Sequence, residues 1–417
     1  MVSQLTEGWM VKWNAERINL IDNGVSELPE SPICSNLVLL FLQKNCDLMV
    51  IPPLFFECMP MLQVLDLSYT SIKTLPASIS RLVSLQKLLL RGCELFTELP
   101  PEVGELSILQ VLDMEGTEIM YLPEEIKELK NLLLLKLSFY GYGNSYRESK
   151  QISKMIPQGV LSDLFLLKEL SIDVNPEDEE WIADLKDIIY ELQNLKRLTK
   201  LKLYLPKVEL LKRLTVSSFR FTVGCHEQRM ISRLPHEVEE EFKKHETSLR
   251  YINGERIPTE IKKTLKRTSA FFLDRHCTVK KLSEFGNANM INLKLCLLVE
   301  CNELKTIIDE KRDYKFEDCP KIKSVVSHES TMVESTHFLP ALKKMSLLEL
   351  PELVSISSGL CMAPKLERLV VFYCPKLESL STIDSKDLKG EKFEGPISNE
   401  LDRVILGKKK VFVMARC

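Results

Sequence analysis

The chain has 417 residues, of which 45% are hydrophobic and 28% are charged. This length exceeds the size at which a single compact core usually stops growing, so we expect several domains or an elongated repeat array. The formal net charge is only −3, which argues against a protein that binds nucleic acid through its overall charge.

No segment has the composition of a membrane anchor or of a secretory signal. The longest apolar run, residues 37–42, is far shorter than the roughly 20 residues that a membrane helix needs. Residues 1–13 lack the basic and then apolar pattern of a signal peptide. We therefore predict a cytoplasmic protein without membrane insertion, and we interpret its 12 cysteines as intracellular thiols rather than disulfides.

A repeat of about two dozen residues begins near residue 18. Each copy contains two apolar residues in alternation, then most often Asn, Thr or Cys three residues later, and then a Leu-Pro or Ile-Pro pair. The strand patterns start at Ile18, Leu40, Leu65, Leu88, Leu112 and Leu135. Their spacing of 22 to 25 residues lies within the roughly 20–29 residues typical of leucine-rich repeats.

Each part of the repeat has a physical cause. Successive residues of a strand point to opposite faces, so the two leucines of Leu65-Asp66-Leu67 share one buried face. The polar turn residue can satisfy backbone groups of the buried turn, and proline disfavours a helix directly before it. Short helical turns are expected at 77–82 and 124–129. We predict an α/β leucine-rich-repeat solenoid (a horseshoe), with a parallel β-sheet on its concave face and short helices or turns on its convex face.

The pattern is less regular after residue 137. Within a poorly matching segment, the charged stretch 237–245 is expected to be a helix or a loop. Cys301, Cys319 and Cys374 take the turn position of variant repeats further on. We predict a leader or junction at 1–16, an N-terminal repeat array at 17–220 with an insertion at 138–169, an irregular segment at 221–290, C-terminal variant repeats at 291–380 and an atypical basic tail at 381–417.

The repeat sequences also point to a family. Residues 62–76 and 89–93 resemble the repeats of plant coiled-coil nucleotide-binding leucine-rich-repeat disease-resistance proteins. The start of the array at 13–20 is similar to the junction where that family's repeats begin. The Cys-Pro-Lys-Leu sequence at 374–377 is similar to its C-terminal repeats.

The resemblance implies a recognition module for a pathogen effector or for a host protein that the effector modifies, and a role in restraining a nucleotide-binding switch domain. The family's coiled-coil and NB-ARC domains are not identified here, because no Gly-x-x-x-x-Gly-Lys-Ser/Thr loop occurs. We therefore expect no ADP or ATP cofactor in this chain. The alternative is a generic intracellular repeat scaffold or a non-functional truncated resistance-gene fragment.

Chemical sites are weakly indicated. Cys296, Cys301 and Cys319 lack the close Cys-x-x-Cys pairs of a zinc site. His236 and His245 are nine residues apart and do not match His-Glu-x-x-His. No Ser, Cys and His constellation supports nucleophilic catalysis, so we predict a protein that is not an enzyme and that holds no metal.

The residues that flank the buried pair of each strand are the candidates for binding another protein. They are expected to face outward on the concave side, where alternating charges can give specificity and aromatic residues can anchor a partner. Aspartates such as Asp66 belong to this row rather than to a magnesium site. Tyr142 and Tyr146 of the insertion are expected to lie near the same row. The candidates are Asp66, Ser68, Lys87, Arg91, Asp113, Glu115, Lys136, Ser138, Tyr140, Arg368 and Phe372.

Overall fold

The computed structural model describes most of the chain. The described residues are 15–140, 154–225, 236–307, 339–354, 363, 365–377, 403–406 and 409–414. The chain divides into unit 1, Met1–Phe221 with Cys225–Ile231, and unit 2, Thr222–Gly224 with Ser232–Cys417. Tyr142, Tyr146 and Cys319 lie outside the described residues.

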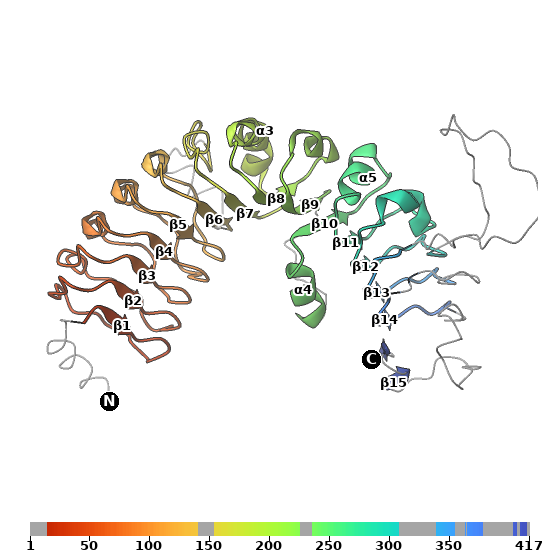
Figure 1. Ribbon diagram of the computed structural model, residues 1–417, viewed down its shortest axis with the longest axis horizontal. Coiled ribbons are helices and arrows are strands. Elements are labelled where there is room, and N and C mark those ends of the chain that lie inside the picture. The colour runs from red at the N-terminus through yellow and green to blue at the C-terminus, as the bar shows by residue number, and fades with distance from the viewer. Residues whose placement is uncertain are drawn as a thin grey trace, which may run out of the picture. The chain divides into compact units, whose positions relative to one another are not determined.

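Unit 1 is a stack of coils that each add one strand to a parallel sheet (Figure 1). The strands are β1 Arg17–Asn19, β2 Leu39–Phe41, β3 Val64–Asp66, β4 Lys87–Leu89, β5 Val111–Asp113, β6 Leu134–Phe139, β7 Glu169–Val174, β8 Lys200–Leu205 and β9 Ser218–Val223, the last of which reaches the boundary with unit 2. The helices are the 3-10 helices η1 Ala77–Arg81, η2 Pro101–Glu105, η3 Glu124–Glu128 and η4 Val208–Arg213, and the α-helix α3 Glu179–Asn194.

The prolines of the repeat mark where the helical turns start. Pro76, Pro100 and Pro123 have extended backbone angles and directly precede η1, η2 and η3. Proline fits this position because it fixes φ and needs no hydrogen-bond acceptor for a missing N–H. The helical turns predicted at 77–82 and 124–129 are confirmed as short 3-10 helices.

The leucines of successive coils stack in register. Leu65 pairs with Leu88, and Leu88 pairs with Leu112, as partners in neighbouring parallel strands. All three side chains have no solvent exposure. Because one coil cannot bury these leucines alone, the stack holds together through a core shared between neighbours. The predicted solenoid, with its parallel sheet, is confirmed.

The turn residues form a second line of contacts between coils. The Asn45 side chain accepts hydrogen bonds from the backbone of Asn23 and Val25 and donates to the carbonyls of Leu20 and Leu42. Further along, the Thr70 hydroxyl donates to Leu67 of its own coil, and the Cys93 thiol donates to the same carbonyl from the next coil. These bonds satisfy backbone groups that the stack would otherwise bury without partners. The predicted role of the turn residues is confirmed.

One residue before each turn residue, the backbone is left-handed. This holds in each coil from β1 to β5 and from β10 to β14 of unit 2, whether the residue is glycine or not. Gly92 has a φ of 68°, and the ring of Tyr69 lies where a Cβ on Gly92 would stand. The left-handed residues are Asp22, Lys44, Tyr69, Gly92, Gly116, Asn253, Arg275, Glu300, Glu349 and Tyr373.

Unit 2 continues the same design. Its strands are β10 Thr247–Ile252, β11 Ala270–Asp274, β12 Leu295–Val299, β13 Lys344–Leu348 and β14 Arg368–Phe372, which pair in parallel, and β15 Arg403–Leu406 and β16 Lys409–Met414, which pair antiparallel with each other. Strand β16 pairs in parallel with β14. The helices are α4 His236–Lys243, α5 Thr259–Leu265, η5 Leu282–Phe285 and η6 Asn287–Asn289.

The segment predicted to be irregular, 221–290, differs from that expectation. It contains α4, two full strands and a turn built on His276, whose Nδ1 accepts from the backbone N–H groups of Thr278 and Val279. The predicted tail at 381–417 also contains strands, β15 and β16. Across the residues that the structure describes, no helix is both long and apolar enough to cross a bilayer.

Candidate functional site

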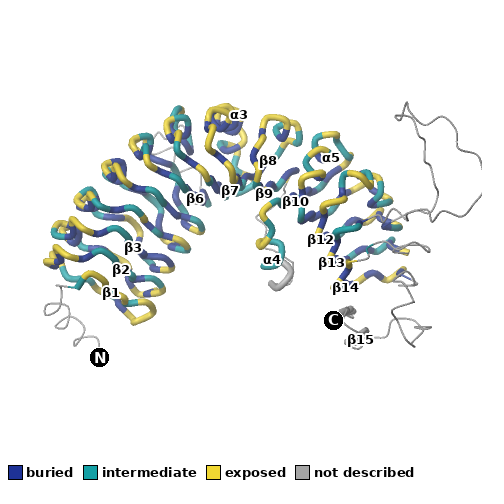
Figure 2. Tube along the Cα trace, in the orientation of Figure 1, coloured by how far each residue is buried: buried dark blue, intermediate teal, exposed yellow. Residues whose placement is uncertain are grey.

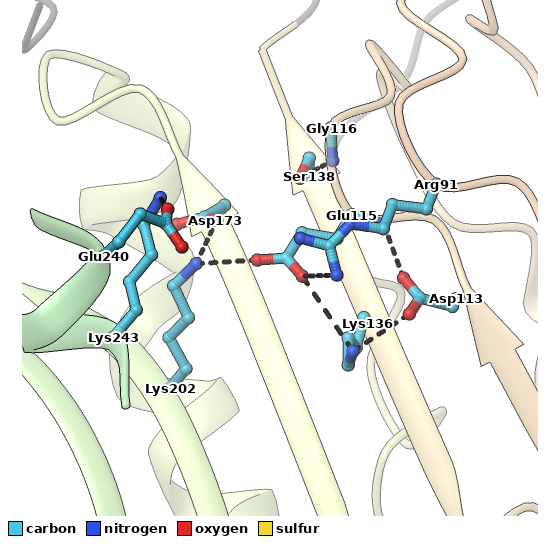
Figure 3. Close-up of polar contacts among 10 residues, drawn as sticks. All are labelled: Arg91, Asp113, Glu115, Gly116, Lys136, Ser138, Asp173, Lys202, Glu240 and Lys243. Atoms are coloured by element: carbon cyan, nitrogen blue, oxygen red, sulfur yellow. Dashed lines mark hydrogen bonds and ion pairs between the residues drawn. The ribbon is translucent and has the colours of Figure 1, made fainter. Parts of the chain in front are cut away.

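The inner face of each unit's sheet is the face opposite the stacked leucines. In unit 1 this face carries six charged residues that contact one another, and we call them the ionic network (Figure 3). The strands and the turns that follow them supply these side chains. The network consists of Arg91, Asp113, Glu115, Lys136, Asp173 and Lys202. Its three basic and three acidic groups balance.

Glu115 lies at the centre of the ionic network. Its carboxylate is 3.1 Å from the Lys202 ammonium, 3.6 Å from the Arg91 guanidinium and 3.9 Å from the Lys136 ammonium. Lys136 also lies 2.9 Å from Asp113, and Lys202 also pairs with Asp173. Each cation other than Arg91 therefore bridges two carboxylates, as the dashed lines in Figure 3 show.

Small residues make possible the contact that spans the most strands, which joins Lys202 to Glu115. Lys202 lies three strands away from the coil that carries Glu115, and the strands between them place Ser138 and Ser171 on the inner face. Both serines are buried. Since neither projects far from the sheet, both leave room for the Lys202 side chain. Figure 3 shows this side chain reaching Glu115.

The network changes the ionisation of its members. Burial alone raises the pKa of Glu115, but the positive charges of Lys202, Arg91 and Lys136 outweigh it and hold the pKa below its ordinary value. For Lys202, burial lowers the pKa, whereas Asp173 and Glu115 raise it to a net value above the ordinary one. Glu115 and Lys202 are therefore both ionised at neutral pH.

The predicted site residues divide by their accessibility. Lys87 and Arg91 are exposed, and Glu115, Lys136 and Tyr140 are half-buried. These side chains remain accessible candidates for contact with a partner.

Four other predicted residues are buried, and three of them accept hydrogen bonds from the backbone. The Asp66 carboxylate accepts from the Ser68 N–H, and the Asp113 carboxylate accepts from the Glu115 N–H. Ser68 is itself buried, and Ser138 has no exposure. The Ser138 hydroxyl accepts a hydrogen bond from Gly116 N–H at 2.8 Å. The expectation that Ser138 faces a partner is therefore corrected, because its hydroxyl is used within the fold.

Apolar residues border the ionic network on the side of β1 to β5. Leu39, Phe41, Val64 and Leu89 are half-buried on the inner face. The guanidinium of Arg17 lies 5.1 Å from the centre of the Phe41 ring, which fits a cation–π contact. The inner face of unit 1 thus offers both charge and apolar area. Figure 2 shows that the strands of this unit mix buried and half-buried positions.

Arg368 and Phe372, the two predicted residues of unit 2, begin and end β14. Both are half-buried, and Phe372 packs against an apolar cluster on the inner face of unit 2. They therefore belong to a different surface from the ionic network.

The structure gives no support for a metal centre within the residues that it describes, since no three His, Cys, Asp or Glu side chains gather to hold an ion. His236 lies in α4, and the side chain of His245 instead contacts the Ser269 hydroxyl. Burial raises the pKa of the Cys296 and Cys301 thiols to about 12. These two cysteines therefore stay protonated and pack as apolar residues.

Asp173 and Lys202 are the members of the ionic network that the sequence analysis missed. The sequence at 201–203 alternates as the earlier strand patterns do, and Lys202 lies between the two leucines of its buried pair. The rule that selected Lys136 therefore selects Lys202 as well. Asp173 lies one position beyond its pattern, as Ser138 does in β6, and the register pairs these two residues.

Comparison with known proteins supports the repeat fold. Residues 61–221 match the family model of a leucine-rich repeat region. A solved structure, the functional domain of InlJ from Listeria monocytogenes, aligns with a TM-score of 0.50 at 12% identity, over 88% of this chain and 64% of that one. At this identity the likeness concerns the fold alone. The chain is a leucine-rich-repeat solenoid.

Proteins related in sequence indicate which leucine-rich-repeat proteins this chain is similar to. The chain is 49% identical to disease resistance protein RFL1 of Arabidopsis thaliana over 82 residues, which are 19% of this chain and 9% of that protein. It is 49% identical to disease resistance protein SUMM2 of the same plant over 78 residues, 18% of this chain and 9% of that protein. The chain thus covers less than a tenth of either relative, and its repeats are related to those of plant disease resistance proteins.

Proposed function

We propose that the inner face of unit 1 binds another protein, and that the chain is the recognition module of a cytoplasmic plant immune receptor. The proposed partner is a pathogen effector or a host protein that an effector modifies. In a longer protein the same module regulates a nucleotide-binding switch domain. The similarity to proteins named for disease resistance supports the defence role.

The ionic network and the exposed basic residues beside it carry this proposal. We call Arg17, Lys87 and Arg91 the basic border. Arg91 is half exposed, and Lys87 lies exposed on the strand just before it. Both are basic, and Arg17 adds a third basic group beside Phe41. A partner that places acidic groups over this border and an apolar side chain near Phe41 would find complementary charge, which steers association and selects among partners.

The network behind this border contributes rigidity. Its cations are held by carboxylates on neighbouring coils, so they lose little freedom when a partner arrives. Binding a surface that is already ordered costs less conformational entropy than ordering loops on contact. The proposed surface is therefore a preformed one.

The test compares two charge reversals of the same kind. Arg91→Glu, combined with Lys87→Glu, changes the proposed surface, and Arg81→Glu changes an exposed arginine of η1 outside it. Proteins bound to each variant in plant cells are compared with those bound to the wild-type chain by co-immunoprecipitation and mass spectrometry. We expect the first variant to lose a defence-related partner or switch domain that the wild type and Arg81→Glu retain. Identical partners for all three chains would refute the proposal.

A further inference from the structure

The inner face of unit 2 carries a large apolar cluster, whereas that of unit 1 carries the ionic network. Seven buried apolar residues from four strands form a continuous cluster on it, which we call the apolar patch. Their register sets them side by side, as Phe272 with Leu297 and Val299 with Leu348. The patch consists of Ala270, Phe272, Leu295, Leu297, Val299, Leu348 and Val370. The leucines of the main core lie on the opposite face, so these seven need a second cover.

Helix α4 supplies part of that cover. Phe242 packs against the patch, and its ring centre lies 6.1 Å from that of Phe272 in an edge-to-face arrangement. Such pairs contribute beyond the area that they bury. The Arg250 guanidinium also lies over the Phe272 ring, 4.2 Å from its centre. Figure 1 shows α4 on the strand side of unit 2, away from α5.

An ion pair at the edge of the patch fixes the helix. Glu241 lies 2.6 Å from the Lys344 ammonium at the start of β13, and both side chains are about 30% exposed. The hydrogen bond and charge of Lys344 hold the pKa of Glu241 below its ordinary value. In the register Lys344 lies beside Arg368 of β14, so the edge of the patch carries two basic residues. An acidic side chain next to an aromatic one therefore matches this surface.

Helix α4 is also short. Its eight residues are fewer than the roughly 12–15 that an isolated helix needs for marginal stability in water. Its order therefore depends on the contacts with the patch. A helix that offers the same aromatic and acidic side chains on a longer apolar face would bury more of the patch, and the two helices could not occupy it together.

We propose that the inner face of unit 2 is a second docking surface, which takes an amphipathic helix of a partner protein carrying an acidic residue beside an aromatic one, and that α4 occupies it as an internal competitor. Release of α4 opens the surface, and partner binding keeps it open. This surface is distinct from the ionic network of unit 1 and does not depend on the function proposed for that network.

A peptide added in trans tests the docking surface. The probe is a fluorescently labelled peptide with the sequence of residues 234–248, and its binding to the full chain is measured by fluorescence anisotropy. We expect Phe242→Asp, which releases α4, to bind the peptide about tenfold more tightly than the wild type, whose surface is occupied. Lys263→Glu on the exposed side of α5 should bind it as the wild type does. A peptide that carries Phe242→Asp should bind none of the chains.

Equal peptide affinity for wild type and Phe242→Asp would overturn the proposal, as would no binding to either. Dimers of Phe242→Asp that form without peptide binding would also overturn it, because they would make a second copy of the chain the occupant.

A charge exchange keeps the test informative if Phe242→Asp does not fold. Glu241→Lys and Lys344→Glu are made singly and together, and amide hydrogen exchange is followed in residues 240–246. We expect each single variant to accelerate exchange about fivefold, which corresponds to about 1 kcal/mol for a partly exposed pair, and the double variant to restore most of the protection. Unchanged exchange in the single variants, or no recovery in the double variant, would overturn the assignment of α4 as the occupant.

Discussion

The two units place opposite chemistry on the same structural element. At the third strand position, the inner face of unit 1 presents Asp66, Leu89, Asp113 and Lys136 in register, whereas unit 2 presents Phe272, Leu297, Ser346 and Val370. Charged groups can pair across strands and remain partly in water, but apolar groups need a cover. The stack of coils specifies the backbone, and the inner-face residues decide whether a surface stays open or is occupied from within.

The largest expected effect on stability comes from replacing an inner-face leucine by lysine. The same replacement is made once in each unit. Leu297→Lys places a charge in the apolar patch, where Leu297 has no exposure, and should lower the free energy of unfolding of unit 2 by more than about 3 kcal/mol. Leu89→Lys places the same charge between Asp66 and Asp113. It should change stability by less than about 1 kcal/mol. Urea denaturation followed by circular dichroism measures both, and equal losses would contradict the contrast between the faces.

The second effect is a pH dependence of stability that one turn residue, His276, gives to unit 2. Burial holds the pKa of His276 below its ordinary value of 6.5. The unfolded chain therefore takes up a proton that the folded chain excludes, so the contribution of neutral His276 is complete above pH 6.5 and is lost as pH falls toward its lower folded pKa. Asn45 and Thr70 of unit 1 do not titrate.

His276→Asn preserves an acceptor for the N–H groups of Thr278 and Val279 without titrating. Between pH 7.5 and 5.5 we expect the wild type to lose about 1 kcal/mol more stability than His276→Asn. Thermal unfolding at both pH values gives the comparison. The same pH dependence in both proteins would assign the effect to other groups, such as His245, whose pKa burial also lowers.

The third effect tests the ionic network. Glu115→Gln leaves Lys202, Arg91 and Lys136 without their shared carboxylate. We expect a loss of about 1 kcal/mol at low salt that shrinks in 1 M NaCl, because salt screens the remaining repulsion among the cations. Glu105→Gln, at an exposed position of η2 in the same unit, is the matched control and should change stability little. A loss that is independent of salt would indicate packing rather than charge.

The smallest effect is expected outside the inner face. Lys130 and Asp163 form an ion pair at 3.0 Å between two coils, and both are more than a third exposed. Lys130→Ala should cost less than about 0.5 kcal/mol, because exposed pairs gain little over hydration. Chemical denaturation can detect whether it costs as much as Glu115→Gln. If it does, a shared carboxylate on the inner face contributes no more to stability than an ordinary exposed ion pair.

The sequence predicts unit 1 better than unit 2 for a physical reason. In unit 1, polar residues separate the inward leucines, as in Leu65-Asp66-Leu67, so the alternation is visible. In unit 2 both faces are buried, and strands such as Leu295–Val299 are continuously apolar, which hides the alternation. The turn residue of β11 is His276 rather than Asn, Thr or Cys, because the turn requires only a group that can hydrogen-bond the backbone.

The candidate site was predicted in part. The strand pattern places Arg91, Glu115 and Lys136 on the inner face correctly, since it depends only on alternation. The pattern does not reveal that Ser138 is buried under neighbours or that Lys202 reaches across three strands. Those contacts depend on which residues the register sets beside one another, and the pattern of a single strand does not contain that information.

The left-handed residue that follows each of the strands β1 to β5 and β10 to β14 affects how the surface can change during evolution. A non-glycine residue such as Tyr69 or Tyr373 pays a conformational cost there of the order of 1 kcal/mol. Both side chains are about half exposed at the rim of the inner face. The turn contacts impose the backbone whatever side chain is present, so this row can exchange residues without altering the path of the chain. A new specificity could thus be acquired one coil at a time, at a small and nearly constant loss of stability.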